Sequence, residues 1–262
     1  MGEQILSPHH PLLQQVVQYF WVLEGQASGP EDITLIYPEG CTEIIFSFAG
    51  PTRWVRGDQI LSLHGSVFSP IRTGYFNVCP QEEVAYLAIR FWPESIPLLQ
   101  IPVNELANQA IALDDVLDKS LRSMFAPLYN MDNMPGRIAY LEQVLLKWVM
   151  QQTYRLPEEI IHALKLFQRT NGEISVHQVA EQCGTYNRKL ERDFLRYLGV
   201  SPKTYSRIIR FNQTVYFLQH NTSFDITEAV YQIGYADQAH FIRECREFTG
   251  LTPGGLFRLL SA

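Results

Sequence analysis

The chain has 262 residues, of which 46% are hydrophobic and 18% are charged, and its formal net charge is −6. This composition is typical of a protein that buries a core, and it excludes a disordered or fibrous chain. No apolar run approaches the roughly 20 residues that a membrane-spanning helix needs, and the first residues lack the pattern of a secretory signal. The four cysteines, Cys41, Cys79, Cys183 and Cys245, form no CxxC pair. We therefore expect free thiols in a reducing cytoplasm, with neither a zinc site nor a disulfide framework.

The chain before about residue 95 is β-rich in its composition and in the alternation of its apolar residues. A short helix is predicted over 11–22, and turn signals such as Pro38-Glu39-Gly40 separate the expected strands. Short strands at this spacing suit a small barrel or sandwich. The predicted strands span residues 32–37, 43–48, 59–68, 74–79 and 84–91.

From residue 93 the pattern becomes helical, most clearly over 115–129 and 136–151. The second stretch carries an apolar stripe at helical spacing, formed by Ile138, Leu141, Leu145 and Trp148. Such a stripe indicates either a helix packed on its own core or a helix that joins two copies of the chain.

The polar segment 153–157 ends in a proline and precedes a new helical pattern, so it predicts a domain boundary. We expect two domains and an α+β fold. Residues 1–150 would form a β-rich domain with helices, and residues 157–262 would form an all-helical domain.

The helical part contains an internal repeat. Residues 176–184 match residues 226–234 at an offset of 50, and four later positions match at an offset of 51. Each copy runs from an apolar-rich helix through a glycine turn to a second helix, and ends in a glycine and a Ser-Pro or Thr-Pro pair. Two short helices joined by a tight turn form a helix-turn-helix unit, whose second helix enters the major groove of DNA. The repeat therefore predicts two such units.

Both copies begin with a helix-capping signal. Ser175 is followed three residues later by Gln178, and Asp225 is followed by Glu228. In this pattern the first side chain accepts from free backbone N–H groups of the helix, and the second reaches back to the cap. We expect a capping box at each position.

The turns and the connection between the copies fit the same arrangement. Gly184 and Gly234 fall where the first helix of each unit must stop, a position that favours positive φ. Residues 202–219 predict one long connecting helix of about 27 Å, at about 1.5 Å per residue. With its flanking turns this helix would let one chain read two successive turns of DNA, which are about 34 Å apart.

Charge is unevenly distributed along the chain. Residues 1–155 carry 9 basic and 16 acidic side chains, whereas residues 156–262 carry 12 basic and 11 acidic ones. Between residues 188 and 210, seven basic side chains stand against two acidic ones. The contrast indicates different roles for the two halves, and the basic stretch is typical either of a DNA-facing helix or of an ordinary solvated helix face.

The helical part resembles the AraC/XylS family of bacterial transcriptional regulators. The resemblance rests on ITEAVYQIGYADQAHFIR at 226–243 and FTGLTP at 248–253, together with Arg192 and GVSP at 199–202. It covers about residues 158–260 and implies seven helices, with two DNA readers joined by a long helix. It also implies double-stranded promoter DNA as a partner, and RNA polymerase if the regulator activates.

Polar residues that face outward on the second helix of each unit are the candidate base readers. Arginine can donate two hydrogen bonds to guanine, and Gln or Asn can pair in the same way with adenine. For Arg192 and Arg243 a phosphate or structural contact is the alternative, and Ala239 offers only an apolar contact, so the second unit is expected to read fewer bases. The resemblance places the family's base contacts on Arg188, Glu191, Arg192, Gln238, Ala239, His240 and Arg243, and Asn187 and Lys203 complete the candidate DNA-binding set.

The first half resembles the small cupin-like sensor domain that is attached to some AraC-type regulators. The residues that carry this resemblance are YFWVLE at 19–24, PEGCTE at 38–43 and IRFWP at 89–93. The resemblance implies effector sensing or dimerisation, so a small-molecule effector and a second copy of the chain are expected partners.

An enzyme in the first half is the main alternative. Cupin barrels often hold a metal through an HxH pair, but only His9, His10 and His64 precede residue 157, and no HExxH, GxSxG, Walker or GxGxxG motif is present. We therefore expect no catalysis, metal or cofactor. Glu43 and Arg90 could line a pocket on neighbouring strands, although a surface or structural role is favoured.

Two other classes of protein can be weighed. A methyl-transfer repair protein would need an activated or metal-bound thiol, which the cysteine spacing does not offer. An architectural DNA binder that senses nothing would not need the acidic first half.

Overall fold

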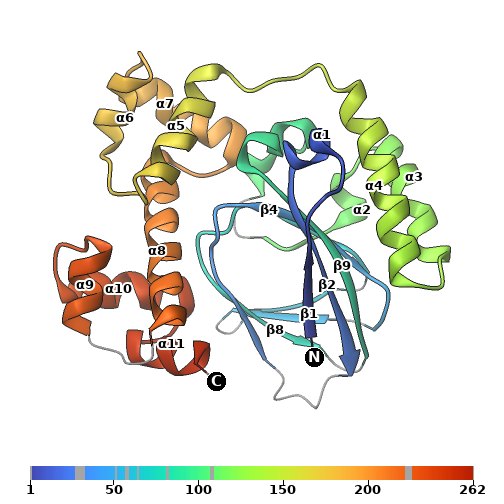
Figure 1. Ribbon diagram of the computed structural model, residues 1–262, viewed down its shortest axis with the longest axis horizontal. Coiled ribbons are helices and arrows are strands. Elements are labelled where there is room, and N and C mark those ends of the chain that lie inside the picture. The colour runs from blue at the N-terminus through green and yellow to red at the C-terminus, as the bar shows by residue number, and fades with distance from the viewer. Residues whose placement is uncertain are drawn as a thin grey trace. The chain divides into compact units, whose positions relative to one another are not determined.

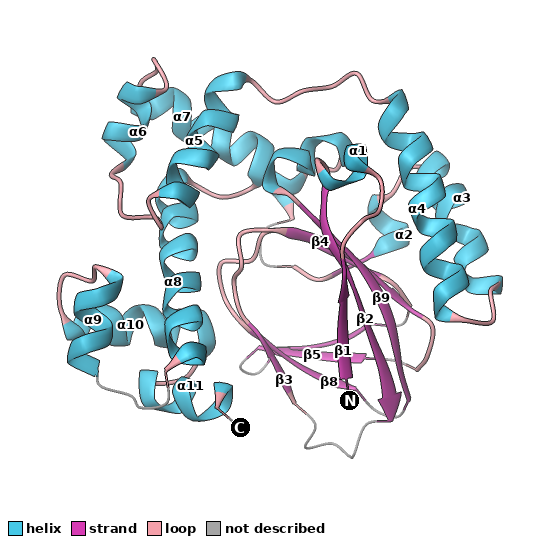
Figure 2. Cartoon of the chain, viewed as in Figure 1, coloured by secondary structure: helices cyan, strands magenta, loops and turns pink. Residues whose placement is uncertain are grey.

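The computed structural model describes residues 2–26, 33–50, 52–56, 59–63, 65–80, 83–106, 109–221 and 226–261. The chain divides into two compact units. Unit 1 comprises Met1–Thr34, Cys41–Pro70 and Asn77–Leu156, and unit 2 comprises Leu35–Gly40, Ile71–Phe76 and Pro157–Ala262. All described strands precede residue 113, and only helices follow Pro157, so the predicted α+β class is confirmed (Figures 1 and 2).

The strands form two antiparallel sheets. The six-stranded sheet has the order β1-β2-β9-β4-β7-β10, and the four-stranded sheet has the order β3-β8-β5-β6. The strands are β1 (Gly2–Leu6), β2 (Val17–Gln26), β3 (Thr34–Ile36), β4 (Thr42–Ser47), β5 (Thr52–Arg56), β6 (Gln59–Leu63), β7 (Val67–Ser69), β8 (Phe76–Pro80), β9 (Glu83–Phe91) and β10 (Ile111–Ala112).

The centre of the larger sheet is apolar on one face. Ile44 and Phe46 of β4 lie opposite Ile89 and Leu87 of β9, and all four side chains are fully buried. Phe46 also packs edge-on against Phe125, with the ring centroids 5.1 Å apart. Burial of such side chains stabilises the folded state by about 1.5–3 kcal/mol each. This face, covered by helical residues such as Phe125, is the core of unit 1.

The helices before residue 157 are mostly short. On α4 the predicted apolar stripe is buried at Leu141 and Leu145, while Ile138 and Trp148 are half-buried. The α-helices are α1 (Pro11–Gln14), α2 (Leu113–Val116), α3 (Lys119–Phe125) and α4 (Met134–Gln151), and the 3-10 helices are η1 (Pro93–Leu99), η2 (Val103–Glu105) and η3 (Ala126–Asn130).

Three sequence predictions for this part were wrong in detail. The helix expected over 11–22 stops at Gln14, and strand β2 begins at Val17 because β1 and β9 pair with it on both sides. The strand expected over 59–68 is two strands in different sheets, β6 and β7, separated near Gly65, whose φ is +84°.

The helix expected over 115–129 is also divided. Asp118 caps a new helix by accepting from the backbone N–H of Leu121, so α2 and α3 are separate, and η3 follows with a proline in its first turn. In addition, the short strands β1 and β5 were not predicted at all. Strand β1 pairs with β2, and β5 pairs both with β6, which follows it directly in the sequence, and with the more distant β8.

Unit 2 is built from helices after Pro157. The long connecting helix α8 has 19 residues, or about 28 Å at about 1.5 Å per residue. The helices are α5 (Glu158–Arg169), α6 (Val176–Gln182), α7 (Asn187–Leu198), α8 (Pro202–His220), α9 (Ile226–Ile233), α10 (Gln238–Thr249) and α11 (Pro253–Leu260).

Aromatic residues hold these helices together. The rings of Phe167, Phe194 and Tyr205, from α5, α7 and α8, lie edge-on to one another at centroid distances of 5.9–6.0 Å. Phe211 of α8 meets Phe248 of α10 in the same way at 5.2 Å. Helix α8 therefore contributes to the core around both α7 and α10.

Candidate nucleic-acid interface

Helices α6 and α7 form the first helix-turn-helix unit. Ser175 accepts from the backbone N–H of Gln178 and the Gln178 side chain accepts from the backbone N–H of Ser175, so the predicted capping box is present. The turn follows at Gly184, whose φ is +63°. The second predicted box needs Asp225 and the side chain of Glu228, which lie outside the described residues.

Helix α7 separates its apolar and polar side chains. Leu190, Phe194 and Leu198 are buried. Most polar residues of its first two turns point away from the core, and Asp193 is the buried exception. Four of them are exposed candidates for base contact: Asn187, Arg188, Glu191 and Arg192.

The basic side chains Lys189 and Arg192 of α7 differ in how fully ion pairs engage them. The Lys189 ammonium lies 2.6 Å from Oε1 of Glu159 and 3.0 Å from Oδ2 of Asp193. Because the ammonium donates to it, the pKa of Glu159 is held below its usual value. Arg192 donates from Nε to Oδ1 of the buried Asp193 at 3.2 Å, yet its side chain stays 66% exposed. Asp193 therefore orients Arg192 while the rest of the guanidinium remains open to solvent.

Helices α9 and α10 form the second unit. The turn between them passes through Gly234, whose φ is +76°. Asp237 caps α10 by accepting from the backbone N–H of His240 at 2.6 Å. The cap fixes the first helical turn, where the candidate readers of this unit begin.

The candidate readers of α10 differ in exposure. Gln238, Ala239 and Arg243 are exposed. His240 is half-buried, with its ring edge-on to Tyr235 at a centroid distance of 5.4 Å. Phe241 is fully buried, and it holds the opposite face of this turn against the core.

Lys203 stands apart from the other candidates, in the first turn of α8, and is exposed. It lines an open pocket of about 610 Å³ together with His240 and Arg243. Residues of the loop before α6, such as Ser175, lie on another side of this pocket. The pocket therefore brings candidate residues of the linking helix and of the second unit into one polar hollow.

Two family models match the chain. A model described as a helix-turn-helix domain matches residues 179–258. This part of the chain is a helix-turn-helix domain of the AraC type. A model described as a domain of unknown function (DUF6597) matches residues 5–112. A comparison with curated proteins finds none that matches.

Two solved structures of ToxT share the fold of this chain at low sequence identity. A 1.65 Å structure of ToxT from Vibrio cholerae has a TM-score of 0.50 at 13% identity, over 93% of this chain and 99% of that chain. A structure of an apo ToxT variant from Vibrio cholerae strain SCE256 also has a TM-score of 0.50 at 13% identity, over 92% of this chain and 97% of the other. The AraC-like transcriptional activator CuxR matches at a TM-score of 0.24 and 13% identity, over 80% of this chain and 86% of its own.

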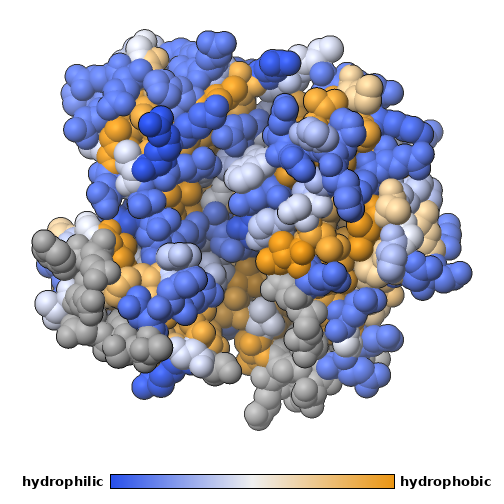
Figure 3. Space-filling model, in the orientation of Figure 1, coloured by the Kyte–Doolittle hydropathy of each residue, from blue (hydrophilic) through white to orange (hydrophobic). Residues whose placement is uncertain are grey.

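The surface of the AraC-type unit is mixed in character. Figure 3 shows mainly hydrophilic residues around α6 and α7, with apolar residues between them. Within the described part of the chain, no helix is long and apolar enough to span a membrane.

Some residues that shape the AraC-type unit were missed in the sequence. Asp237 stands directly before the second recognition helix and is a preferred N-cap residue type, so its role could have been inferred. Glu244, Arg207 and Arg210 form ion pairs between helices that are distant in the sequence, for which no local signal exists.

In unit 1, Glu43 and Arg90 form a buried ion pair. The side chains are 7% and 9% exposed, and Oε1 of Glu43 lies 3.4 Å from Nη1 of Arg90. Trp21 donates to Glu43, and Arg90 donates to Gln18 and stacks over the ring of Tyr19. These contacts support the structural role favoured for the pair. His64, the remaining candidate ligand in the first half, lies outside the described residues.

Proposed function

We propose that this chain is a sequence-specific DNA-binding regulator of transcription that reads double-stranded promoter DNA with two helix-turn-helix units. The observation that carries the proposal is the repeated construction of α7 and α10. Each helix buries an apolar face, at Phe194 and Phe241, and exposes polar residues from its first turns. A recognition helix in the major groove needs this division.

Each candidate reader has a chemical role in the proposal. Arg188, Arg192 and Arg243 pair with guanine or with phosphate, and Gln238 pairs with adenine. Ala239 contacts a thymine methyl group. The remaining candidates are Asn187, Glu191 and His240 at base edges, and Lys203 at a phosphate.

The first domain, about residues 1–150, regulates the reader domain of about residues 157–262. It does so by binding a small molecule or by pairing with a second copy of the chain, and the regulator contacts RNA polymerase if it activates. The AraC-like fold over most of the chain supports this division, as does the acidic composition of residues 1–155, which DNA binding alone does not require. The proposed function needs no catalysis, metal or cofactor.

The experiment that tests DNA reading is selection of genomic fragments by the native protein, Arg192→Ala and Arg243→Ala. Arg122→Ala serves as the matched control, because this exposed arginine lies on α3, outside the helix-turn-helix units. We expect the native protein and the control to enrich one two-part motif, and each reader variant to relax a different part. Absence of any enriched motif would refute the proposed function.

The sensing role is tested by thermal unfolding of the full chain with candidate metabolites. A ligand that binds the folded state raises the melting temperature by an amount that grows with its concentration relative to Kd. We expect one such ligand also to change the affinity for the selected fragment. If no metabolite affects either quantity and the chain stays monomeric on DNA, the first domain does not regulate in this way.

A further inference from the structure

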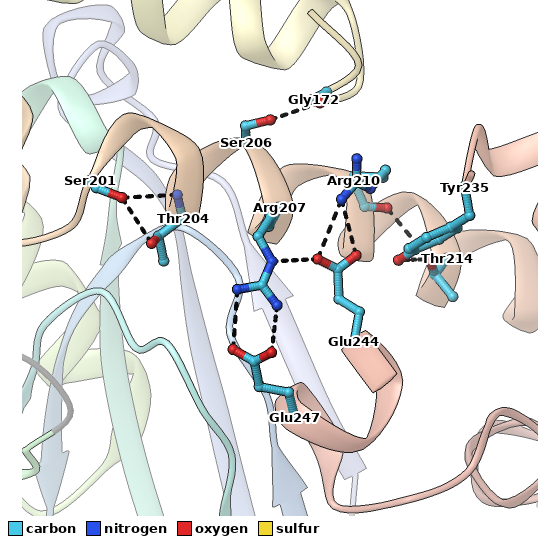
Figure 4. Close-up of polar contacts among 10 residues, drawn as sticks. All are labelled: Gly172, Ser201, Thr204, Ser206, Arg207, Arg210, Thr214, Tyr235, Glu244 and Glu247. Atoms are coloured by element: carbon cyan, nitrogen blue, oxygen red, sulfur yellow. Dashed lines mark hydrogen bonds and ion pairs between the residues drawn. The ribbon is translucent and has the colours of Figure 1, made fainter. Parts of the chain in front are cut away.

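A buried ionic cluster joins the linking helix α8 to the second recognition helix α10. Glu244 of α10 is 1% exposed, and its carboxylate lies 2.7 Å from Nε of Arg207 and 3.2 Å from Nη2 of Arg210 (Figure 4). Arg207 also donates from Nη1 and Nη2 to Glu247, at 3.1 and 2.5 Å. Two guanidinium groups therefore surround one buried carboxylate, and a second carboxylate closes the cluster.

The same cluster reaches the turn of the second unit. The Arg210 guanidinium lies over the ring of Tyr235 at 4.9 Å, and the Tyr235 hydroxyl lies 3.2 Å from Oγ1 of Thr214. Burial raises the pKa of Tyr235, so the hydroxyl stays protonated. The Tyr235 ring supports His240, one of the candidate readers. Arg210 thus acts on both the turn and the recognition helix.

The same turn of α8 also holds the first unit. The Ser206 hydroxyl donates to the carbonyl oxygen of Gly172 at 2.7 Å, in the loop that leads into α6. A Cβ at Gly172 would lie 2.2 Å from the carbonyl oxygen of Ser206, so the two backbones are in close contact. Residues 206–210 of α8 therefore connect the loop before the first unit to the recognition helix of the second.

These ion pairs lower the number of basic side chains that are free to contact DNA phosphates. Of the seven basic residues between 188 and 210, three are engaged by carboxylates of other helices or turns: Lys189, Arg207 and Arg210. A cation contributes to the salt dependence of DNA binding only if it neutralises a phosphate and releases a counterion. Breaking a buried pair is costly, because it leaves an uncompensated charge. Arg207 and Arg210 are thus held away from phosphate contact.

We propose that Arg207, Arg210 and Glu244 are positioning residues that fix α10 on α8 and do not themselves contact DNA. The proposal rests on the function proposed above. It assigns the specificity of the second unit partly to a buried carboxylate, which keeps Gln238 and Arg243 aligned with the readers of α7.

The first test is the salt dependence of affinity for the selected fragment, measured for the native chain, Arg207→Met and Arg210→Met. Loss of one phosphate contact lowers the slope of log K against log salt by about 0.9. We expect both variants to keep the native slope while binding more weakly. A slope lower by about 0.9 in either variant would overturn the proposal, since it would place that arginine on a phosphate.

The second test is fragment selection by Glu244→Gln, which removes the charge but keeps the shape, and it applies even if the methionine variants fail to fold. We expect the part of the motif read by α10 to broaden and the part read by α7 to stay native. General destabilisation would reduce the active fraction without changing the motif. A native motif with Glu244→Gln contradicts the proposal, whereas failure of the native chain to enrich any motif contradicts the proposed function instead.

Discussion

Glycines with similar backbone angles have different surroundings in the helical unit. Gly172 and Gly184 both adopt positive φ, at +73° and +63°. A Cβ at Gly172 would overlap the backbone of Ser206, but a Cβ at Gly184 would meet nothing within 4 Å. Only the first glycine is therefore required for close packing as well as for the turn.

We predict that Gly172→Ala destabilises the chain much more than Gly184→Ala. Left-handed backbone alone costs alanine about 1 kcal/mol, which is the full effect expected at Gly184. At Gly172 the overlap adds to this cost, for a total of about 3 kcal/mol or more. Urea unfolding of the two variants measures the difference, and equal free energies of unfolding would show that the close contact is absent.

The Cys245 thiol makes the free energy of unfolding depend on pH in the alkaline range. The side chain is fully buried, and burial raises its pKa from 9.0 to about 11. The folded state binds the thiol proton more tightly than the unfolded state does. The stability that the protonated thiol contributes is therefore complete below pH 9 and is lost as the pH rises toward 11. We predict that Cys245→Ala loses less stability than the native chain between pH 8 and about 10.5. Urea midpoints across this range check the slope, and equal slopes for Cys245→Ala and the native chain would contradict the prediction.

The two proposed recognition helices, α7 and α10, begin differently. The first, α7, follows Tyr186, which makes no side-chain cap, whereas α10 is capped by Asp237. The backbone N–H groups at the start of α10 therefore depend on one carboxylate. The candidate readers Gln238 and Ala239 lie directly after it.

We predict that Asp237→Ala frays the first turn of α10 and costs about 0.5–2 kcal/mol of stability. DNA affinity should fall more for Asp237→Ala than for Thr252→Ala. The latter removes the equivalent cap of α11, a helix that carries no candidate reader. Asp237→Asn retains a cap and should bind almost as the native chain does. An affinity lost equally in Asp237→Ala and Thr252→Ala would mean that the effect is general destabilisation.

The elements of the helical unit were predictable because their signals are local. Ser175 with Gln178 marks the start of α6, and Gly184 marks its end, all within ten residues. Strand β2 was mistaken for helix because its pairing with β1 and β9 depends on distant segments. The pair between Arg207 and Glu244 joins residues 37 positions apart. A basic stretch that the sequence assigned either to a DNA-facing or to a solvated helix face is therefore partly internal.

The whole chain is acidic, whereas the proposed function requires it to bind an acidic polymer. The net charge of −6 gives no long-range attraction to DNA, so affinity depends on close contacts of a few free cations. Exposed charges are largely screened beyond about 10 Å in 0.1 M salt. The acidic first half is therefore compatible with specific binding at moderate ionic strength.

In the proposed function, one chain reads two adjacent turns of DNA with two readers held at a fixed spacing. The most direct measurement is the affinity for the selected fragment and for copies with about 5 or about 10 base pairs inserted between the two parts of the motif, which correspond to a half turn and a full turn of DNA. We expect both insertions to weaken binding at least tenfold, or about 1.4 kcal/mol, because α8 and its ion pairs do not let the second reader follow its site. Unchanged affinity for both inserted copies would contradict this expectation, since only one helix-turn-helix unit would then be reading the DNA.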